Sequence, residues 1–191
     1  MSEFLLPILA LCVLLAPLGV AALGHRHVVE RWLGRIVQGA FAFSSACVLA
    51  LMLVQATIVV LRSVFSVNFI WLQESTLYLF GAMFLLSSGA LLLSEGHVRV
   101  DIFYGKLSEK RQQLIDLAGM VLFVLPVSAL IILVSWDYVM ISWAQLERSQ
   151  ETSGIHAVFL MKSMIPAFAA LLILSAELRI MDLAHRLRSA P

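Results

Sequence analysis

The five histidines are the side chains of this sequence best suited to bind haem or a metal ion. A bis-histidine haem site in a membrane needs two histidines that face each other at matched depth inside spanning helices. All five instead lie in or beside polar segments of the chain: His25, His27, His97, His156 and His185. We therefore expect no cofactor and no metal site. A membrane anchor for a redox enzyme is an alternative function that this pattern disfavours.

Serine and cysteine are the other candidate reactive groups. Ser87 and Ser88 lie in an apolar run that contains no histidine to act as their base, which favours helix packing over nucleophilic catalysis. Cys12 and Cys47 lie in uncharged apolar runs, which is typical of small hydrophobic residues rather than of a zinc site or a disulfide framework. The sequence therefore predicts a protein that is not an enzyme.

Lys162 is the one charged residue in the apolar run 157–176. A lysine near the end of a span can extend its ammonium group to the membrane surface, and a role in an ion pathway is the alternative. A transporter that works alone usually shows charges near the membrane midplane and paired repeats. The centres of the apolar runs are almost free of charge, so a free-standing small transporter is a further, disfavoured alternative.

The composition indicates an integral membrane protein. Hydrophobic residues make up 61% of the chain and charged residues 13%, with a mean hydropathy of +0.97. Soluble proteins average about 45–50% apolar and 25% charged residues. The net charge is +1 and no long basic run occurs, so we expect membrane lipids and not nucleic acid as partners.

Five apolar runs predict an all-α, polytopic helical membrane protein with a single transmembrane domain over residues 1–191. Each run has the roughly 20 residues that a helix needs to cross a bilayer. The predicted spans are about 4–23, 36–61, 75–94, 117–136 and 157–176. The first contains Pro7 and Pro17, so a re-entrant or surface-lying segment is the alternative there.

The polar segments alternate in positive charge. They contain 3 Arg and Lys residues in 24–35, 1 in 62–74, 4 in 95–116, 1 in 144–156 and 3 in 177–191. Because segments rich in Arg and Lys stay in the cytoplasm, the amino terminus should be outside and the carboxyl terminus inside. Trp71 and Glu74 then lie at the outer surface, with Trp71 as an interfacial anchor.

Two faces of small residues and one amphipathic strip predict contacts. Small residues let membrane helices approach closely, so we expect one such face to meet a helix of this bundle and another to meet a partner. The two faces are Ala42, Ala46 and Ala50, and Gly81, Ala82, Ser88 and Gly89. The strip over 24–35 has arginines on one side, which suit anionic lipid headgroups.

A charged stretch, 94–101, separates the third and fourth spans as a cytoplasmic hinge. His97 and Asp101 share a face if it is helical, and Arg99 joins them if it is extended. These charges either cap helix ends locally or contact a partner. Beyond the stretch, Ser108 followed by Glu109 predicts the start of a helix, and Pro126 should kink it.

The hinge and the segment before the third span resemble the small membrane (Q, or DctQ-like) subunit of tripartite ATP-independent periplasmic (TRAP) transporters. The likeness covers roughly residues 32–180. The residues that carry it are Arg62, Phe65, Asn68, Trp71 and Glu74, then Glu95, His97, Arg99 and Asp101, and later Trp136, Trp143, Lys162 and Pro166.

The resemblance implies four family-type transmembrane helices, so the run 4–23 is an extra amino-terminal hydrophobic helix. It implies a large (M type) permease subunit of the elevator kind, which carries the substrate and sodium sites, and a periplasmic substrate-binding protein. This chain would extend the static scaffold in a bacterial inner membrane during uptake of an organic acid. Trp71, Glu74, His97, Arg99, Asp101 and Lys162 are then candidate structural or partner-contact residues.

Overall fold

The computed structural model describes residues 5–20, 26–94, 104–105 and 107–189, and this part of the chain is helical without strands. A π-helical turn, Met120–Val124, joins α5 to α6. The helices are α1 (Leu5–Val20), α2 (Arg26–Val64), α3 (Ile70–Leu93), α5 (Glu109–Gly119), α6 (Leu125–Ala144) and α7 (Val158–Ser189). Four helical segments are long and apolar enough to cross a membrane, namely α2, α3, the continuous α5–α6 unit and α7. The predicted all-α class, with four long helices and a shorter amino-terminal one, is confirmed.

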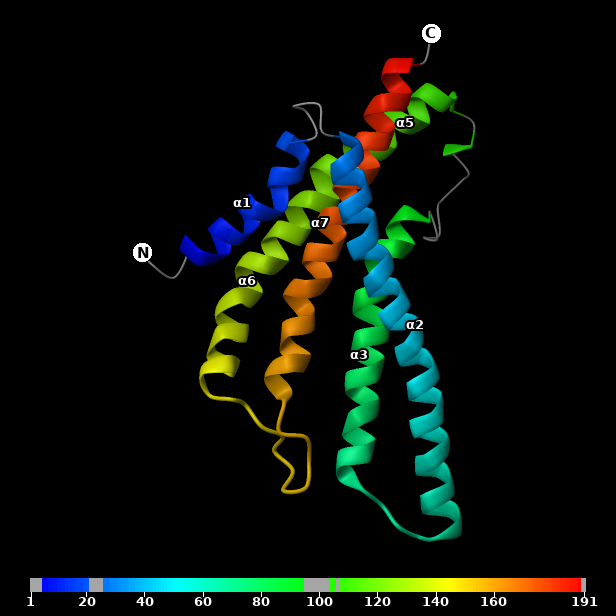
Figure 1. Ribbon diagram of the computed structural model, residues 1–191, viewed down its shortest axis with the longest axis vertical. Helices are drawn as coiled ribbons and strands as arrows, with labels where there is room; N and C mark the ends of the chain where they lie inside the picture. The colour runs from blue at the N-terminus through cyan, green and yellow to red at the C-terminus, as the bar shows by residue number, and fades with distance from the viewer. Residues whose placement is uncertain (1–4, 21–25, 95–103, 106, 190–191) are drawn as a thin grey trace.

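The long helices form two antiparallel hairpins. Residues 65–69 connect α2 to α3, and residues 145–157 connect α6 to α7. Both connections lie at the same end of the bundle, here called the loop end, while α5 and the carboxyl end of α7 lie at the other (Figure 1). This arrangement agrees with the alternation of charge along the sequence, since both connections at the loop end are poor in cations.

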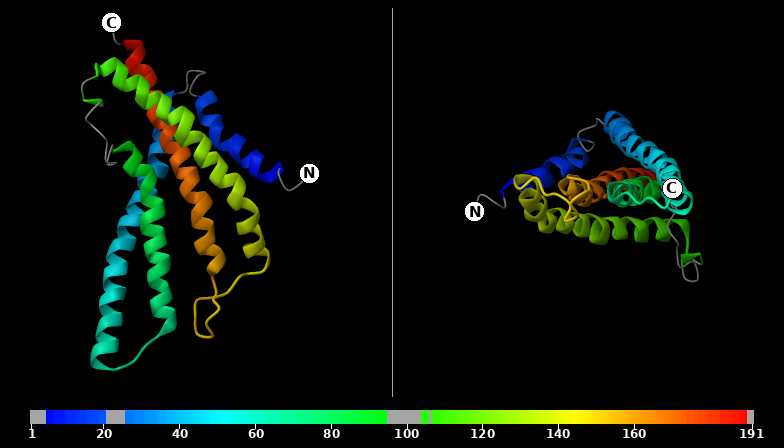
Figure 2. Two further views of the ribbon diagram at one scale, coloured as in Figure 1. Left: turned by 180° about the vertical axis from the view of Figure 1, so that it is seen from behind. Right: turned by 90° about the horizontal axis from the view of Figure 1, so that it is seen from below.

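The central helix is α7, which contacts α1, α2, α3, α5 and α6. The right view of Figure 2, seen from the loop end, shows it between the α2–α3 hairpin and α6. Small residues on α7 let the neighbouring helices pack closely against it. Ala169, Ser175 and Ala176 are completely buried. Larger residues fill the remaining space, with Ile173 fully buried against Ile132 of α6.

Two helices are longer than the apolar runs within them. In α2 the amphipathic strip and the following span form one helix of 39 residues, about 58 Å long at 1.5 Å per residue. In α7 the helix continues through the segment expected to be a polar tail. Within that segment Glu177 is fully buried.

The Pro126 region departs from α-helical geometry one turn before the proline. A proline lacks the N–H that would bond to the preceding turn, and its ring clashes with that turn's carbonyl group. The π-helical turn widens the helix at this point and accommodates the clash, with the Leu125 N–H bonded to the Met120 oxygen. The predicted disruption at Pro126 therefore takes the form of a π-turn.

The shorter helix α1 lies obliquely against α6 and α7 (Figures 1 and 2). Its packing side carries Leu11, Leu14 and Leu18, which contact the two main core clusters. The described helix has 16 residues, about 24 Å at 1.5 Å per residue, against a hydrocarbon core of about 30 Å. Positions 4 and 21–23 of the predicted span lie outside the described residues.

Candidate functional site at the loop end

The α6–α7 connection is anchored by the way α6 ends. The N–H of Leu146 bonds to the Trp143 oxygen and the N–H of Glu147 bonds to the Ser142 oxygen, which is the Schellman pattern. This pattern needs a left-handed residue, and Leu146 occupies that position with a φ of 45°. A non-glycine residue there costs roughly 1–2 kcal/mol. The left-handed conformation of Leu146 turns the chain back, so that Glu147 faces the bundle.

Glu147 is the centre of a polar cluster between α6 and α7. Its Oε2 accepts hydrogen bonds from Lys162 Nζ at 2.5 Å and from Ser142 Oγ at 2.6 Å. The Lys162 ammonium also lies 4.0 Å from the ring centroid of Tyr138, within cation–π range. The Lys162 charge is therefore compensated by the connecting loop.

The Lys162 hydrogen bond and then the Ser142 hydrogen bond hold the pKa of Glu147 below its usual value, against the opposing effect of partial burial. Both bonds favour the ionised form of the carboxyl group. The side chain is about one-third exposed, so solvent reaches the pair.

Glu74 ties the same loop to the other hairpin. Its Oε1 accepts a hydrogen bond from Ser149 Oγ, and its Oε2 accepts one from the backbone N–H of Ile155 at 2.6 Å. The loop is itself closed by a bond from the Ser149 N–H to the Ile155 oxygen. One carboxylate of α3 thus holds both ends of a compact loop, and we call the Glu74 and Glu147 contacts together the loop clamp.

Gly154 makes the close approach possible. A Cβ atom added there would lie 2.6 Å from Ser149 Cβ and 2.7 Å from Glu74 Oε1. Real Cβ atoms essentially never come so near, and therefore a side chain at 154 would displace the loop from Glu74.

Aromatic residues lie at the ends of α6, α7 and α3 nearest the loop clamp. Trp143 donates its indole N–H to Ser163 Oγ at 2.8 Å and packs on Phe159, with ring centroids 4.6 Å apart. Trp71 lies at the start of α3, where half of its surface is exposed, and its ring is 6.1 Å from that of Phe69. A half-exposed tryptophan at a helix end suits either the membrane interface or a protein partner.

The two small-residue faces have different environments. Ala82 and Gly89 are buried, and a Cβ atom on Gly89 would lie 2.8 Å from Ser175 Oγ and 3.0 Å from the Leu171 oxygen. A Cβ atom added to Gly81 would lie 3.4 Å from Met164 Sδ of α7. Ser88 is half-buried, and its hydroxyl bonds to the Leu85 oxygen of its own helix. This face therefore lies against α7.

The other small-residue face points away from the bundle. Ala42 and Ala46 are exposed and Ala50 is half-buried. Ser44 and Cys47 are the residues of this part of α2 that are buried, and Ser44 Oγ bonds to the Met83 oxygen of α3 at 2.7 Å. The Ala42–Ala46 surface is thus open to a partner.

The hinge residues His97, Arg99 and Asp101 lie outside the described residues. The next polar cluster along the described chain joins α5 to α7. Asp116 accepts a hydrogen bond from the Tyr104 hydroxyl at 2.9 Å and pairs with Arg179 at 3.6 Å. Of the predicted candidates, Glu74 and Lys162 are therefore brought to one loop, and Trp71 lies one turn from Glu74.

Sequence reasoning missed the residues that connect them, namely Glu147, Ser149 and Gly154. A signal was present, because Glu147 follows the end of one helix of that hairpin and Lys162 lies one turn into the other. The arrangement can fix helix ends relative to one another. Among the described residues no group of three or more His, Cys, Asp or Glu side chains is placed to hold a metal ion.

One comparison with known proteins gave a match. The sequence model of the family described as "Tripartite ATP-independent periplasmic transporters, DctQ component" matches residues 51–186, well over half of the chain. Neither curated proteins nor solved structures gave a match. The match begins inside α2 and therefore excludes α1 and the arginine-bearing start of α2.

Proposed function

The chain belongs to the DctQ family, the small membrane subunit of TRAP transporters, and we propose that it acts as a static scaffold for the large elevator-type subunit. In this role it holds its own helices fixed while the partner moves substrate across the membrane. Transport is coupled to sodium, and a periplasmic binding protein delivers an organic acid. The family match is the observation that carries the proposal.

The hydrogen bonds of the loop clamp support a static role. Glu74 and Glu147 connect α3, α6 and α7 at the loop end, and the Asp116–Arg179 pair connects α5 and α7 at the other end. Polar contacts at both ends resist sliding of α7 against its neighbours. A scaffold needs such rigidity, because the large subunit can move relative to this chain only if the helices of this chain keep their positions.

The exposed small-residue surface supports contact with the large subunit. Packing and not hydrophobicity drives helix association in a membrane, so exposed alanines at helical spacing offer a place for close approach. We assign Ala42 and Ala46 to this contact. Trp71 is assigned to a contact at the loop end, with the large subunit or with the binding protein.

The charge alternation supports the orientation. The loop end, with Glu74 and Glu147, faces the periplasm of a bacterial inner membrane, and the carboxyl end of α7 faces the cytoplasm. Reporters fused after residues 70 and 150 should therefore report periplasm, and those after 30, 105 and 190 cytoplasm. A tag before residue 4 should be reached by impermeant reagents from outside if the amino-terminal helix spans.

Reconstitution tests the proposal. Vesicles that contain this chain, the large subunit and the binding protein should show sodium-driven uptake of an organic acid, and vesicles lacking either membrane subunit should not. The two subunits should also co-purify from detergent. Robust uptake by this chain alone would overturn the scaffold role and favour a free-standing transporter. A haem absorption band in the purified chain would favour the redox anchor.

A further inference from the structure

The first turns of α2 carry two arginines that no carboxylate of the described residues neutralises. Arg26 is paired with Glu30, with 2.6 Å between Nε and Oε1, and this accounts for the acidic residue of the segment. Arg31 donates its Nε–H to the main-chain oxygen of His27 in its own helix. Arg35 stacks over an aromatic ring instead of pairing with an acid. Two positive charges one turn apart are thus left for an external anion.

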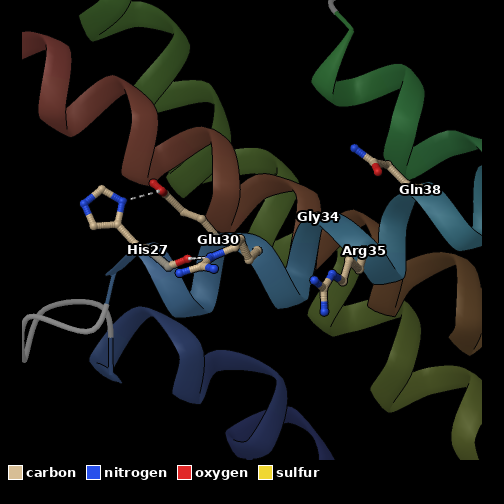
Figure 3. A pocket seen from close by; sticks show the side chains of 6 residues that line it. His27, Glu30, Gly34, Arg35 and Gln38 are labelled. Atoms are coloured by element: carbon tan, nitrogen blue, oxygen red, sulfur yellow. Dashed lines mark hydrogen bonds and ion pairs between the residues drawn. The ribbon is translucent and has the colours of Figure 1, made fainter.

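The two arginines separate a polar hollow from an apolar one. The polar hollow has a volume of about 660 Å³ and is also lined by His27, Gly34, Gln38 and Glu30, whose carboxylate is paired with Arg26 (Figure 3). Nothing lies within 4 Å of the position a Gly34 Cβ would take, so bare backbone forms its floor. This leaves room beside both guanidinium groups.

The second hollow lies on the other side of the same arginines. It has a volume of about 180 Å³ and is completed by Val28 and Trp32. The Arg35 guanidinium carbon lies 5.6 Å from the centroid of the Trp32 ring, which is 61% exposed. Ile36, one turn further along, is also exposed. A ligand over the arginine pair would therefore meet polar groups on one side and apolar groups on the other.

The position of the pair along α2 places it at the membrane surface. Arg35 is the last charged residue before 26 uncharged positions, 36–61. That run alone is about 39 Å long at 1.5 Å per residue, more than the roughly 30 Å hydrocarbon core. Because the same helix continues unbroken through Arg31 and Arg35, these residues lie where headgroups begin.

We propose that Arg31 and Arg35 bind the phosphate group of an anionic phospholipid. Guanidinium groups present paired N–H donors that match two phosphate oxygens. The rest of the headgroup occupies the hollow over Gly34, and the glycerol and upper acyl chain lie against Trp32 and Ile36. A free phosphate would leave the apolar hollow unused, and therefore the geometry favours a lipid.

Native mass spectrometry of the full-length chain tests this site. The purified protein is titrated separately with phosphatidylglycerol, phosphatidylcholine and inorganic phosphate. The first phosphatidylglycerol should bind at a concentration roughly tenfold below that of phosphatidylcholine, and Arg31→Gln with Arg35→Gln should remove this preference. The matched control is Arg62→Gln with Arg148→Gln, which removes two exposed positive charges elsewhere and should leave the preference unchanged.

Further variants separate charge from folding. Arg31→Lys with Arg35→Lys keeps both charges but loses the paired donors, so part of the preference should remain. The proposal is overturned if phosphatidylcholine binds as well as phosphatidylglycerol or if the double glutamine variant keeps the preference. It is also overturned if inorganic phosphate binds as strongly as the lipid. Loss of the bound lipid when the large subunit is added would place an acidic protein partner at this surface instead.

Discussion

The carboxylate of Glu74 accepts a hydrogen bond from the backbone N–H of Ile155, 81 positions later in the sequence, with 2.6 Å between Oε2 and the amide nitrogen. This contact joins the first helical hairpin to the loop of the second. A backbone amide bonded to a carboxylate is protected from exchange with solvent as long as the bond holds. The loop between α6 and α7 is therefore fixed by a residue that belongs to neither helix.

Replacing Glu74 should release that loop. In Glu74→Ala both acceptors are lost, so amide hydrogen exchange in residues 145–157 should rise at least tenfold, whereas Glu74→Gln retains one acceptor and should give an intermediate rise. Hydrogen exchange read by mass spectrometry measures this. Gln73→Ala is the control, since it shortens the neighbouring side chain without touching the loop clamp. Unchanged exchange in Glu74→Ala would mean that the loop is held by other contacts.

The loop clamp should weaken in acid. The pKa of Glu147 in the folded protein is lowered by Lys162 and then by Ser142, so its contribution to stability is fully present above the ordinary glutamate value near 4.5. As the pH falls through the lowered pKa, the carboxyl group takes up a proton and that contribution is lost. The melting temperature of Glu147→Gln should therefore lie below that of the unaltered protein at pH 7, and the difference should shrink below pH 4.

Glu151→Gln provides the control for this measurement. It removes a carboxylate of the same loop whose side chain is exposed, and its melting temperature should follow that of the unaltered protein at both pH values. A difference between Glu147→Gln and the unaltered protein that stays constant from pH 7 to pH 3 would contradict an ionised Glu147 in the cluster.

The helices were predictable because their signals are local. Runs such as 36–61 and 157–176 are recognisable because they contain almost no charged residues. Ser108 followed by Glu109 predicted a helix start, and the structure begins α5 at Glu109. The loop clamp was not predictable in the same way. It depends on Leu146 adopting a left-handed conformation, which leucine rarely does and no sequence pattern indicates.

Glu177 shows a further limit of local reasoning. Its neighbours Arg179 and Asp182 make the segment look like a polar tail, but α1 and the other helices cover this turn of α7 and bury Glu177 completely. Apolar residues one turn to either side, Leu174 and Met181, carry the core signal that could have placed the segment inside. Burial here is decided by which helices pack together, and that is a property of the whole chain.

A side chain at position 154 should open the loop clamp. In Gly154→Ala the new methyl group would lie 2.7 Å from Glu74 Oε1, so the loop must move and stability should fall by roughly 1–2 kcal/mol. Gly119→Ala is the matched change, because nothing lies within 4 Å of its Cβ position in a helix, and it should stabilise by about 0.5–1 kcal/mol. Thermal unfolding of the two variants in the same detergent should thus shift in opposite directions. A Gly154→Ala protein as stable as the unaltered one would show that the loop has room to relax.

The two small-residue faces should respond differently to the same enlargement. Gly89→Leu forces a side chain against the Leu171 backbone of α7, so it should destabilise the isolated chain by about 2–3 kcal/mol. Ala46→Leu extends into open space on α2 and should change the stability of the isolated chain by no more than about 0.5 kcal/mol. If Ala46 meets the large subunit, however, the second variant should lose co-purification and uptake while still inserting in the membrane.

Val48→Phe is the control for the partner contact, because Val48 is also exposed on α2 but lies about 200° around the helix from Ala46. It should leave the isolated chain, the co-purification and the uptake unchanged. Thermal unfolding of the small subunit alone and pull-down of the large subunit separate the two kinds of effect. Normal assembly by Ala46→Leu would show that the large subunit does not pack against this surface, and the partner contact would then have to be sought on another helix.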